Sequence, residues 1–451
     1  MMETMSLSEI ARAVGGELSG QDNLAGGVSI DSRTLKNGDL FIAIKGPKFN
    51  GHEFVFQAIK NGATGAVVSE NFDNKSGAET GLIKVPDTIR ALKELAYYYR
   101  KKYKPKMVGI TGTNGKTTVK EMTAAILSAR YRVLKNEGNL NNQFGIPLSL
   151  FNLAGDHQIA VMELGMSALG EIADLCRLVE PEIGIVTNVG EGHTQYLKDI
   201  QTVGRAKGEL LESLPEGGLA VINGDDENVL AQTSRSSARI IRFGISESCH
   251  YKAEQIDYGP AGTTYMVNGQ PFKMKHLGLH NVYNSLAAIA AGEALGVDLK
   301  TAAEKLAGLN PTPMRLEMID TGRFTVINDA YNANPPSMMA ALKVLGSFDR
   351  ASRKVAILGD MLELGDLEKR WHREVGFFAA EKADLVIAVG PLGKEIQTGA
   401  VGLKSNSLHY QDNAALINEL GSILRENDMI LVKASRGRHF EEIVNAIKGL
   451  S

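Results

Sequence analysis

The chain has 451 residues, with 43% hydrophobic and 22% charged side chains and a formal net charge of −3. It is too long for one hydrophobic core and suggests about three globular domains. The charge balance provides no field that would gather nucleic acid or an anionic membrane surface, and no stretch approaches the roughly 20 apolar residues of a membrane span.

Cysteine usage and the N-terminus predict a cytoplasmic protein in a reducing environment. The cysteines, Cys176 and Cys249, are too few for a disulfide framework or a thiolate metal site. The first ten residues include Glu3 and Glu9 and lack the basic region and apolar core of a secretion signal. The expected substrates are soluble small molecules, with no nucleic acid partner and no membrane insertion.

Residues 1–86 are predicted to form a small α/β domain. Ser32 and Arg33 follow one predicted strand, and Lys45 and Gly46 follow another. Strand ends are where α/β folds bind ligands, but these residue types are equally common in turns, so both roles stay open. The predicted helices cover 8–14 and 52–61, and the predicted strands cover 28–30, 40–44, 65–69 and 81–85.

A second α/β region is predicted from 87 to 313, beginning with a helix at 88–103. Its strand at 107–110 opens into the sequence TGTNGKTT, which we call the P-loop (Thr111–Thr118), and a helix is predicted at 119–129. Ile110 stands where the general P-loop pattern has a glycine, so this loop is a shortened variant.

The residue types of the P-loop indicate phosphate binding. Gly112 and Gly115 let backbone N–H groups surround an anion, and the following helix directs its positive end at it. Lys116 adds a cation and the Thr117 hydroxyl can ligate magnesium. A glycine turn that only joins a strand to a helix would explain the glycines but not Lys116 and Thr117.

Further strands are predicted at 159–162 and 183–187, because both are nearly continuous hydrophobic runs. Glu163 follows the first run, and His193 lies in the loop after the second. Thr117 and Glu163 supply hard oxygen atoms, which suit magnesium better than zinc. For His193, a structural role and a role as ligand of a second cation are equally favoured.

Two helical segments of this region carry polar residues with less distinctive patterns. Lys207 belongs to the charged cluster RAKGE and is expected on a solvated helix face. Asn281 and Asn284 share one face before a predicted helix at 285–295; they could contact a base edge or, as the favoured alternative, cap the helix.

The third region, 314–451, is predicted to be a doubly wound, Rossmann-like domain. No G-x-G-x-x-G opens its strand-to-helix turns, so a dinucleotide site is not expected. Polar motifs follow its strands at 329–335, 359–365 and 433–436, which favours a zwitterionic ligand at this rim. Predicted strands at 324–327, 354–358, 385–389 and 429–432 alternate with predicted helices at 338–345, 367–383, 414–424 and 441–450.

A set of motifs resembles the Mur ligases over essentially the whole chain. The motifs are TGTNGKTT, GNLNNQFGIP, MELG, NVGEGH, RAKGE, HNVYNS, DAYNANP, GDMLELG and VKASR. DAYNANP and GDMLELG resemble the member that joins D-alanyl-D-alanine to UDP-N-acetylmuramoyl-tripeptide in peptidoglycan precursor synthesis. The motifs do not distinguish lysine from diaminopimelate at the third position of the peptide.

The resemblance implies an ATP-dependent ligase of three domains, acting through an acyl phosphate with Mg²⁺ as cofactor. Residues 1–86 would bind the UDP end of the substrate, 87–313 would bind ATP, and 314–451 would bind the dipeptide. A monomer is expected. The alternatives are a sibling ligase that adds a single amino acid and a nucleotide-gated binding protein without ligase activity.

The resemblance also assigns residues by motif. The implied catalytic residues are Lys116, Glu163, His193 and Lys207, and the implied metal ligands are Thr117, Glu163, His193 and Lys207, the last as a carbamate. ATP contacts are implied for Gly112, Thr113, Asn114, Gly115, Lys116, Thr117, Thr118, Asn281, Asn284, Arg315 and Asp329. Substrate contacts are implied for Ser32, Arg33, Lys45, Gly46, Asn139, Asn141, Asn142, Tyr331, Asn332, Asn334, Lys433, Ser435 and Arg436. One departure is Met314, where many members have glycine before the arginine.

Overall fold

The computed structural model describes residues 2–46, 49–73, 80–190, 197, 199–259, 262–348, 353–402 and 406–450. The chain forms two compact units. The first contains Met1–Gly109, Arg130–Met166 and Gly170–Glu182, and the second contains Ile110–Ala129, Ser167–Leu169 and Ile183–Ser451. The α/β class is confirmed, whereas the division at residues 86 and 313 stays a prediction. None of the helices in these ranges is long and apolar enough to cross a membrane.

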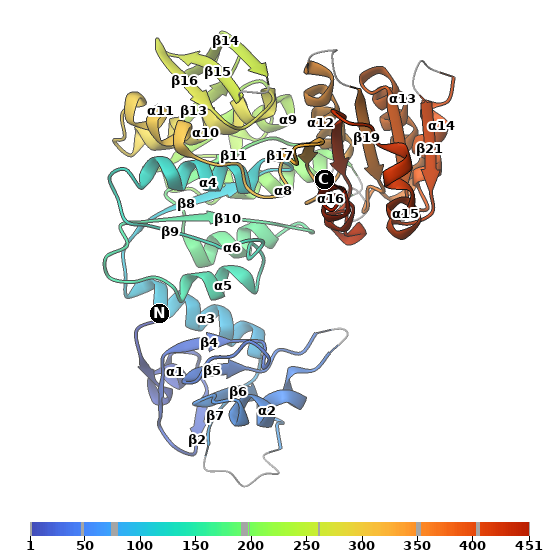
Figure 1. Cartoon of the computed structure of the whole chain (residues 1–451). Coiled ribbons are helices and arrows are strands. Elements are labelled where there is room, and N and C mark those ends of the chain that lie inside the picture. The colour runs from blue at the N-terminus through green and yellow to red at the C-terminus, as the bar shows by residue number, and fades with distance from the viewer. Residues whose placement is uncertain are drawn as a thin grey trace. The chain divides into compact units, whose positions relative to one another are not determined.

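The first unit begins with a five-stranded sheet in the order β2-β7-β6-β5-β4, coloured blue in Figure 1. Strands β4 to β7 run parallel and β2 pairs antiparallel with β7. Phe41, Val55, Ala58 and Val68 form a core between the sheet and α2. The elements are β1 Met5–Ser6, α1 Leu7–Ala13, β2 Glu17–Ser19, β3 Leu24–Ala25, β4 Gly27–Ser29, β5 Asp39–Ile42, η1 Gly51–Phe54, α2 Val55–Lys60, β6 Gly65–Ser69 and β7 Gly81–Val85.

The rest of the first unit comprises helices and two parallel strands. Asp87 caps α3 by accepting hydrogen bonds from Ile89 N and Arg90 N, so the helix begins directly after the sheet. The elements are α3 Thr88–Lys101, β9 Val133–Lys135, α5 Gly145–Leu150, β10 Ile159–Glu163 and α6 Glu171–Val179; β8, Lys106–Thr111, crosses from the first unit into the second along the chain.

The second unit contains a sheet segment in the order β11-β12-β13-β14-β15-β16. Strands β11 to β14 are parallel, and β14, β15 and β16 form an antiparallel meander that the sequence analysis did not predict. The elements are α4 Lys116–Leu127, β11 Ile183–Val186, α8 Ile200–Glu212, β12 Leu219–Asn223, α9 Glu227–Leu230, η2 Thr233–Arg235, β13 Arg239–Gly244, β14 Tyr251–Gly259, β15 Gly262–Val267, β16 Gln270–Met274, α10 Leu279–Ala294 and α11 Leu299–Gly308.

Helix α10 packs closely on α4, and this contact positions the P-loop at the start of α4. A Cβ atom on Gly292 would lie 2.5 Å from Cγ2 of Ile126, so the glycine permits the close approach of the two helices. The alanine-rich sequence of α10 is buried along most of its length, including Ala287, Ala288 and Ala291.

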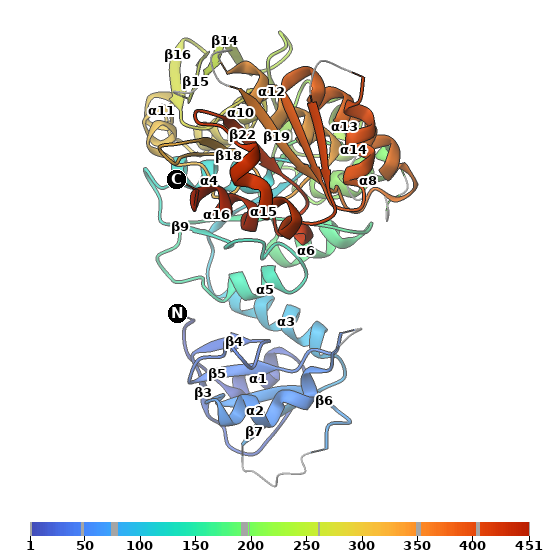
Figure 2. The same ribbon diagram turned by 45° about the vertical axis from the view of Figure 1, so that its right-hand side comes forward.

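The remainder of the second unit is a six-stranded sheet in the order β17-β18-β22-β19-β20-β21, and Figure 2 shows β18, β22 and β19 side by side. All pairs are parallel except β17 with β18. The elements are β17 Glu317–Asp320, β18 Thr325–Asn328, α12 Pro335–Ser347, β19 Lys354–Gly359, η3 Gly365–Leu367, α13 Glu368–Lys382, β20 Leu385–Val389, α14 Gly393–Ala400, β21 Asn406–Tyr410, α15 Asn413–Ile423, β22 Met429–Lys433, η4 Arg436–Arg438 and α16 Glu441–Lys448.

Two hydrophobic cores cover the two faces of this sheet. One core joins Ala356 and Leu358 to Leu342 of α12 and Val375 of α13. The other joins the alternate strand residues, such as Ile357, to α15 and α16. Helices on both faces of a parallel sheet define a doubly wound domain, so the predicted Rossmann-like architecture is confirmed.

Glu180, directly after α6, connects that helix to α3. Its Oε1 accepts a hydrogen bond from the Tyr97 hydroxyl at 2.8 Å, and its Oε2 accepts from Arg100 Nη1 and Lys101 Nζ, each at 2.7 Å. Partial burial raises the pKa of Glu180, but the hydrogen bonds from Lys101, Tyr97 and Arg100 outweigh it and lower the pKa from 4.5 to about 2.

A carboxylate whose pKa is lowered by folding stabilises the fold above its unfolded pKa and loses that contribution as pH falls toward the folded value. We therefore expect Glu180→Gln to lower the urea midpoint slightly at pH 7, since the ion pairs are partly exposed and worth about 1 kcal/mol or less. The difference from wild type should shrink between pH 4.5 and pH 3. A difference that stays constant or grows over that interval would contradict this assignment.

Candidate nucleotide-binding site

The P-loop connects β8 to α4 with the geometry of an anion site. Helix α4 begins at Lys116, three residues before the predicted start, and its N-cap Gly115 has φ +82° and no side-chain cap. Because the N-cap residue is a glycine, no N-cap side chain accepts hydrogen bonds from the first N–H groups of α4. These groups can therefore donate to a bound anion. Lys116 Nζ donates to the carbonyl oxygens of Gly112 at 2.8 Å and Thr113 at 3.0 Å. These contacts keep the amine beside the P-loop, near the first N–H groups of α4.

The two glycines of the P-loop are required by close neighbours. A Cβ on Gly115 would lie 2.2 Å from Asn284 Oδ1, and a Cβ on Gly112 would lie 1.8 Å from Thr187 Oγ1. Gly112 also has a positive φ of 147°. Any side chain at Gly115 would collide with Asn284 of α10, and any at Gly112 would collide with Thr187, directly after β11.

A cavity of about 520 Å³ opens beside the P-loop. Its walls come from the P-loop, the loop after β11, the β12–α9 connection and the first turns of α10. The volume falls in the range of small-molecule sites. The lining residues are Asn114, Gly115, Asn188, Val189, Asn223, Asp225, Asp226, Glu227, Asn228, His280, Tyr283 and Asn284.

Several of these lining residues were missed by the sequence analysis. Asp225 accepts hydrogen bonds from the Tyr283 hydroxyl at 2.8 Å and from Ile245 N at 2.6 Å. Asp226 caps α9 and accepts from Val189 N at 2.8 Å. The signal available was the polar run Asn223-Gly224-Asp225-Asp226 directly after a strand, the same pattern that identified the other strand ends.

Asn281 and Asn284 are buried on the inner face of α10. The N-cap of α10 is Gly278, which has no side-chain cap, so the favoured capping role of the asparagines is wrong. Asn284 Nδ2 donates to Asn281 Oδ1 at 2.9 Å, and Asn281 Nδ2 donates to Leu277 O at 2.9 Å. Of the pair, Asn284 lines the cavity and contacts the P-loop.

Lys207 does not lie on a solvated helix face, so that expectation is wrong. Its side chain, on α8, is 2% exposed. Burial and, secondarily, the positive charge of Lys116 hold the pKa of Lys207 well below its usual value. The local charge pattern of RAKGE could not reveal this, because burial of α8 depends on tertiary packing.

Glu163 ends β10 and is 3% exposed. Asn141 Nδ2 donates to its Oε1 at 2.8 Å, and Asn136 accepts from its backbone N at 2.8 Å. Asn142 is engaged at the start of α5, where its Oδ1 accepts from Phe144 N and Gly145 N. Asn139 is exposed.

The other residues predicted in the first unit lie at strand ends. Ser32 is buried, and Arg33 is exposed and paired with Asp31 at 2.7 Å. Lys45 is exposed and Gly46 is partly exposed. His193 lies outside the described residues. Within the described ranges, no group of three or more histidine, cysteine, aspartate or glutamate side chains forms a metal cluster.

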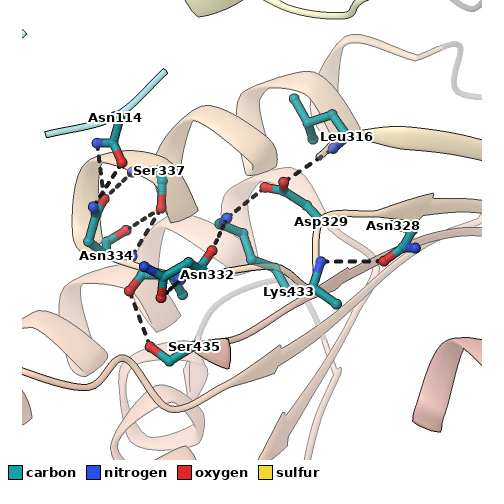
Figure 3. A network of polar contacts seen from close by, with 11 residues as sticks. Asn114, Leu316, Asn328, Asp329, Asn332, Asn334, Ser337, Lys433 and Ser435 are labelled. Carbon is teal, nitrogen blue, oxygen red and sulfur yellow. Dashed lines mark hydrogen bonds and ion pairs between the residues drawn. The ribbon is translucent and has the colours of Figure 1, made fainter. Parts of the chain in front are cut away.

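The DAYNANP loop (Asp329–Pro335) follows β18, and Figure 3 shows its polar network. Asp329 Oδ2 forms an ion pair with Lys433 Nζ at 2.6 Å, and Asp329 Oδ1 accepts from Leu316 N at 3.1 Å. Lys433 is 2% exposed and also donates to Asn332 O at 2.7 Å. Burial lowers the pKa of Lys433, although Asp329 opposes that shift.

Ser435 and Arg436, the remaining predicted residues, follow β22. Ser435 Oγ accepts from Leu362 N at 2.9 Å and donates to Ala333 O at 3.3 Å, joining the loops after β18, β19 and β22. Arg436, with its side chain 52% exposed, pairs with Glu441 at 3.0 Å. The three strand-end motifs therefore lie at one rim, as predicted.

Arg315 connects the DAYNANP loop to the P-loop. Its guanidinium lies 4.1 Å from the ring centroid of Tyr331, and its Nη2 donates to Thr117 Oγ1 at 3.2 Å. The flanking residues Met314 and Leu316 have φ of 60° and 49°, the left-handed region that favours glycine. Met314 thus adopts a backbone conformation that glycine adopts with less strain.

Family models match three successive parts of the chain. They are the Mur ligase family, catalytic domain at residues 25–100, the Mur ligase middle domain at 110–292, and the Mur ligase, glutamate ligase domain at 314–436. The chain is also 39% identical over 448 residues to the UDP-N-acetylmuramoyl-tripeptide–D-alanyl-D-alanine ligase of Bacillus subtilis, with 97% of each sequence covered. The chain belongs to the Mur ligase family.

Solved structures of Mur ligases superpose on the chain. A crystal structure of MurF from Acinetobacter baumannii matches with a TM-score of 0.91 and 30% identity over 99% of both chains. The MurF ligase of Thermotoga maritima in complex with ADP matches with a TM-score of 0.83 and 26% identity, covering 94% of this chain and 97% of that one. The family resemblance inferred from the motifs is confirmed.

Gly115→Ala should weaken nucleotide binding at the P-loop without unfolding the protein. The methyl group would collide with Asn284, and the positive φ adds strain of order 1 kcal/mol. Gly322→Ala is the matched control, because Gly322 has φ +81° but no atom within 4 Å of its Cβ position.

Both variants should lose a similar amount of thermal stability, while binding of ADP measured by calorimetry should weaken at least about tenfold only in Gly115→Ala. Equal ADP affinity in the two variants would show that the close packing of Gly115 is unimportant for the site.

Proposed function

We propose that the protein joins D-alanyl-D-alanine to UDP-N-acetylmuramoyl-tripeptide, with ATP converted to ADP and phosphate, in the cytoplasmic synthesis of peptidoglycan precursors. The observation that carries the proposal is the P-loop, which borders a nucleotide-sized cavity and is hydrogen-bonded to the DAYNANP loop. The name of the Bacillus subtilis relative and the ADP bound to the Thermotoga maritima structure support the same activity.

The proposed chemistry has two steps. A terminal carboxylate oxygen of the tripeptide attacks the γ-phosphorus of ATP, the bond to the β-phosphate oxygen breaks, and ADP leaves. The amine of D-alanyl-D-alanine then attacks the acyl carbon and loses a proton, and the tetrahedral intermediate releases inorganic phosphate. Activation is needed because a carboxylate oxygen is a poor leaving group, so the protein mainly positions the reactants and neutralises charge.

The nucleotide is proposed to bind with its phosphates on the P-loop. Lys116 and the first N–H groups of α4 face the phosphates, and residues Gly112 to Thr118 surround them. Asn284 supplies an amide in the cavity wall, supported by Asn281. Arg315, beside Thr117, and Asp329, beside Lys433, complete the proposed ATP contacts.

Magnesium is proposed as a cofactor because the available donors are hard oxygen atoms. Thr117 and Glu163 would hold one ion, and His193 with Lys207 would hold a second. The ions would shield the charges of the phosphates and the carboxylate. Glu163 suits this role, since one of its oxygens, Oε1, is oriented by Asn141.

Lys207 is proposed to act as a carbamate. A buried amine whose pKa is lowered loses its proton more readily, and the neutral amine can react with carbon dioxide, which turns a potential cation into an oxygen-rich anion. An unmodified ammonium beside Lys116 would repel a metal ion instead.

The two substrates are assigned to separate regions. The UDP end is proposed to bind at Ser32, Arg33, Lys45 and Gly46 of residues 1–86, and the muramoyl peptide at Asn139, Asn141 and Asn142 within 87–313. The dipeptide is proposed to bind within 314–451 at Tyr331, Asn332, Asn334, Lys433, Ser435 and Arg436. Arg436 offers an exposed guanidinium that suits a dipeptide carboxylate. We propose that the protein acts as a monomer, without nucleic acid.

Phosphate release from ATP tests the proposal. With UDP-N-acetylmuramoyl-tripeptide present, we expect sustained release only when D-alanyl-D-alanine is added, together with a product heavier by the dipeptide. Stimulation by single amino acids would indicate a sibling ligase. Nucleotide binding without release in any mixture would indicate a nucleotide-gated binding protein.

Lys207→Ala should reduce the ligation rate on the order of 100-fold, because a metal ligand is removed. Acetate or formate should restore part of the rate by supplying a carboxylate at the vacated position. Lys207→Arg should not respond to either anion, because its permanent cation still occupies the site. Full activity of Lys207→Ala in bicarbonate-free buffer would disprove the carbamate role.

A further inference from the structure

The side chains of Asn114 and Asn334 form a reciprocal amide pair. Asn114 Nδ2 donates to Asn334 Oδ1 at 3.2 Å, and Asn334 Nδ2 donates to Asn114 Oδ1 at 2.9 Å. The residues are 220 positions apart, one in the P-loop and the other in the DAYNANP loop. Figure 3 shows the two amides facing each other at the start of α12.

The amide of Asn334 is largely committed by these contacts. Asn334 is the N-cap of α12, and its Oδ1 also accepts from Ser337 N at 3.0 Å. A carbonyl oxygen has two lone pairs and an amide nitrogen has two N–H groups, so one N–H remains for another partner. The side chain therefore fixes the loop and keeps one N–H that can still donate to a dipeptide.

The P-loop end of the pair is equally well held. The backbone carbonyl oxygen of Asn114 accepts from Thr187 Oγ1 at 2.6 Å and from Asn188 Nδ2 at 3.0 Å. The backbone N–H of Asn114 donates to Asn188 Oδ1 at 2.9 Å. With its backbone fixed, the Asn114 side chain offers a rigid contact to the DAYNANP loop. A displacement of either loop would separate the amides.

We propose that Asn114 and Asn334 are positioning residues, whose amide pair couples nucleotide affinity to the placement of the DAYNANP loop. The inference rests on the proposed function, in which that loop contributes to the dipeptide region. A contact made only when both loops are in place links the two sites, and such coupling is reciprocal. Nucleotide binding would therefore favour the loop arrangement that receives the amine nucleophile.

A double-mutant cycle on ADP affinity, measured by calorimetry on the whole protein, tests the pairing. Asn334→Ser keeps a good N-cap residue and removes the amide, and Asn114→Ala removes the partner. Each variant should bind ADP about three- to tenfold more weakly, the size of one or two net hydrogen bonds. The double variant should bind ADP no more weakly than the single variant with the lower ADP affinity, because both changes break the same contact.

Ser337→Ala is the matched control. Its hydroxyl accepts from Asn334 N at 3.0 Å and donates to Asn334 O at 2.9 Å, so the change weakens the cap without touching the amide pair. ADP affinity should be unchanged in this variant. Unchanged ADP affinity in Asn334→Ser, or losses of affinity that add in the double variant, would overturn the proposed coupling through the amide pair but not the proposed function. Failure of the wild-type protein to bind ADP would overturn the proposed function as well.

Discussion

The close packing of the P-loop against its neighbours is the constraint on which the site depends. Gly115 lies so near Asn284 that no side chain fits between them, and Gly112 lies closer still to Thr187. The contact between Gly115 and Asn284 depends on the tight packing of α10 on α4, which Gly292 permits. The position of the first N–H groups of α4 thus depends on helix packing far along the chain as well as on the local loop sequence.

Positive charge also accumulates near the P-loop. Lys116 and Lys207 are near enough for the charge of one to lower the pKa of the other. A positive charge on the buried Lys207, close to the partly exposed Lys116, is unfavourable unless anions accompany it. A site that binds a triphosphate, and that converts one amine into a carbamate, removes this conflict; the electrostatics therefore agree with the proposed chemistry.

Features encoded in short sequence patterns could be predicted from the sequence. The P-loop, the strand-end position of Glu163 and the doubly wound arrangement of the last domain follow from glycine placement and hydrophobic periodicity. Strand β21 was missed because its sequence, Asn406–Tyr410, is a largely polar edge strand without a hydrophobic run. Helix α14, Gly393–Ala400, was missed because its short, glycine-containing sequence resembles a turn.

Features that depend on long-range contacts could not be predicted. The burial of Lys207 depends on the packing of α8, and the Asn114–Asn334 pair joins residues 220 positions apart. Asn281 and Asn284 are residue types that often cap helices, and only the fold shows that both lie within α10 and that Asn284 faces the P-loop. Local patterns thus identified the strand-end loops, whereas tertiary packing determined which side chains face one another there.

The central claim is that the chain activates a carboxylate by transferring phosphate to it, and isotope transfer tests this most directly. UDP-N-acetylmuramoyl-tripeptide would be prepared with ¹⁸O in its terminal carboxylate and turned over with ATP and D-alanyl-D-alanine. Mass spectrometry of the released phosphate should show one ¹⁸O atom per phosphate formed, because the carboxylate oxygen leaves with the phosphoryl group. Phosphate free of ¹⁸O, released at the rate of ligation, would contradict an acyl phosphate and with it the proposed mechanism of ligation.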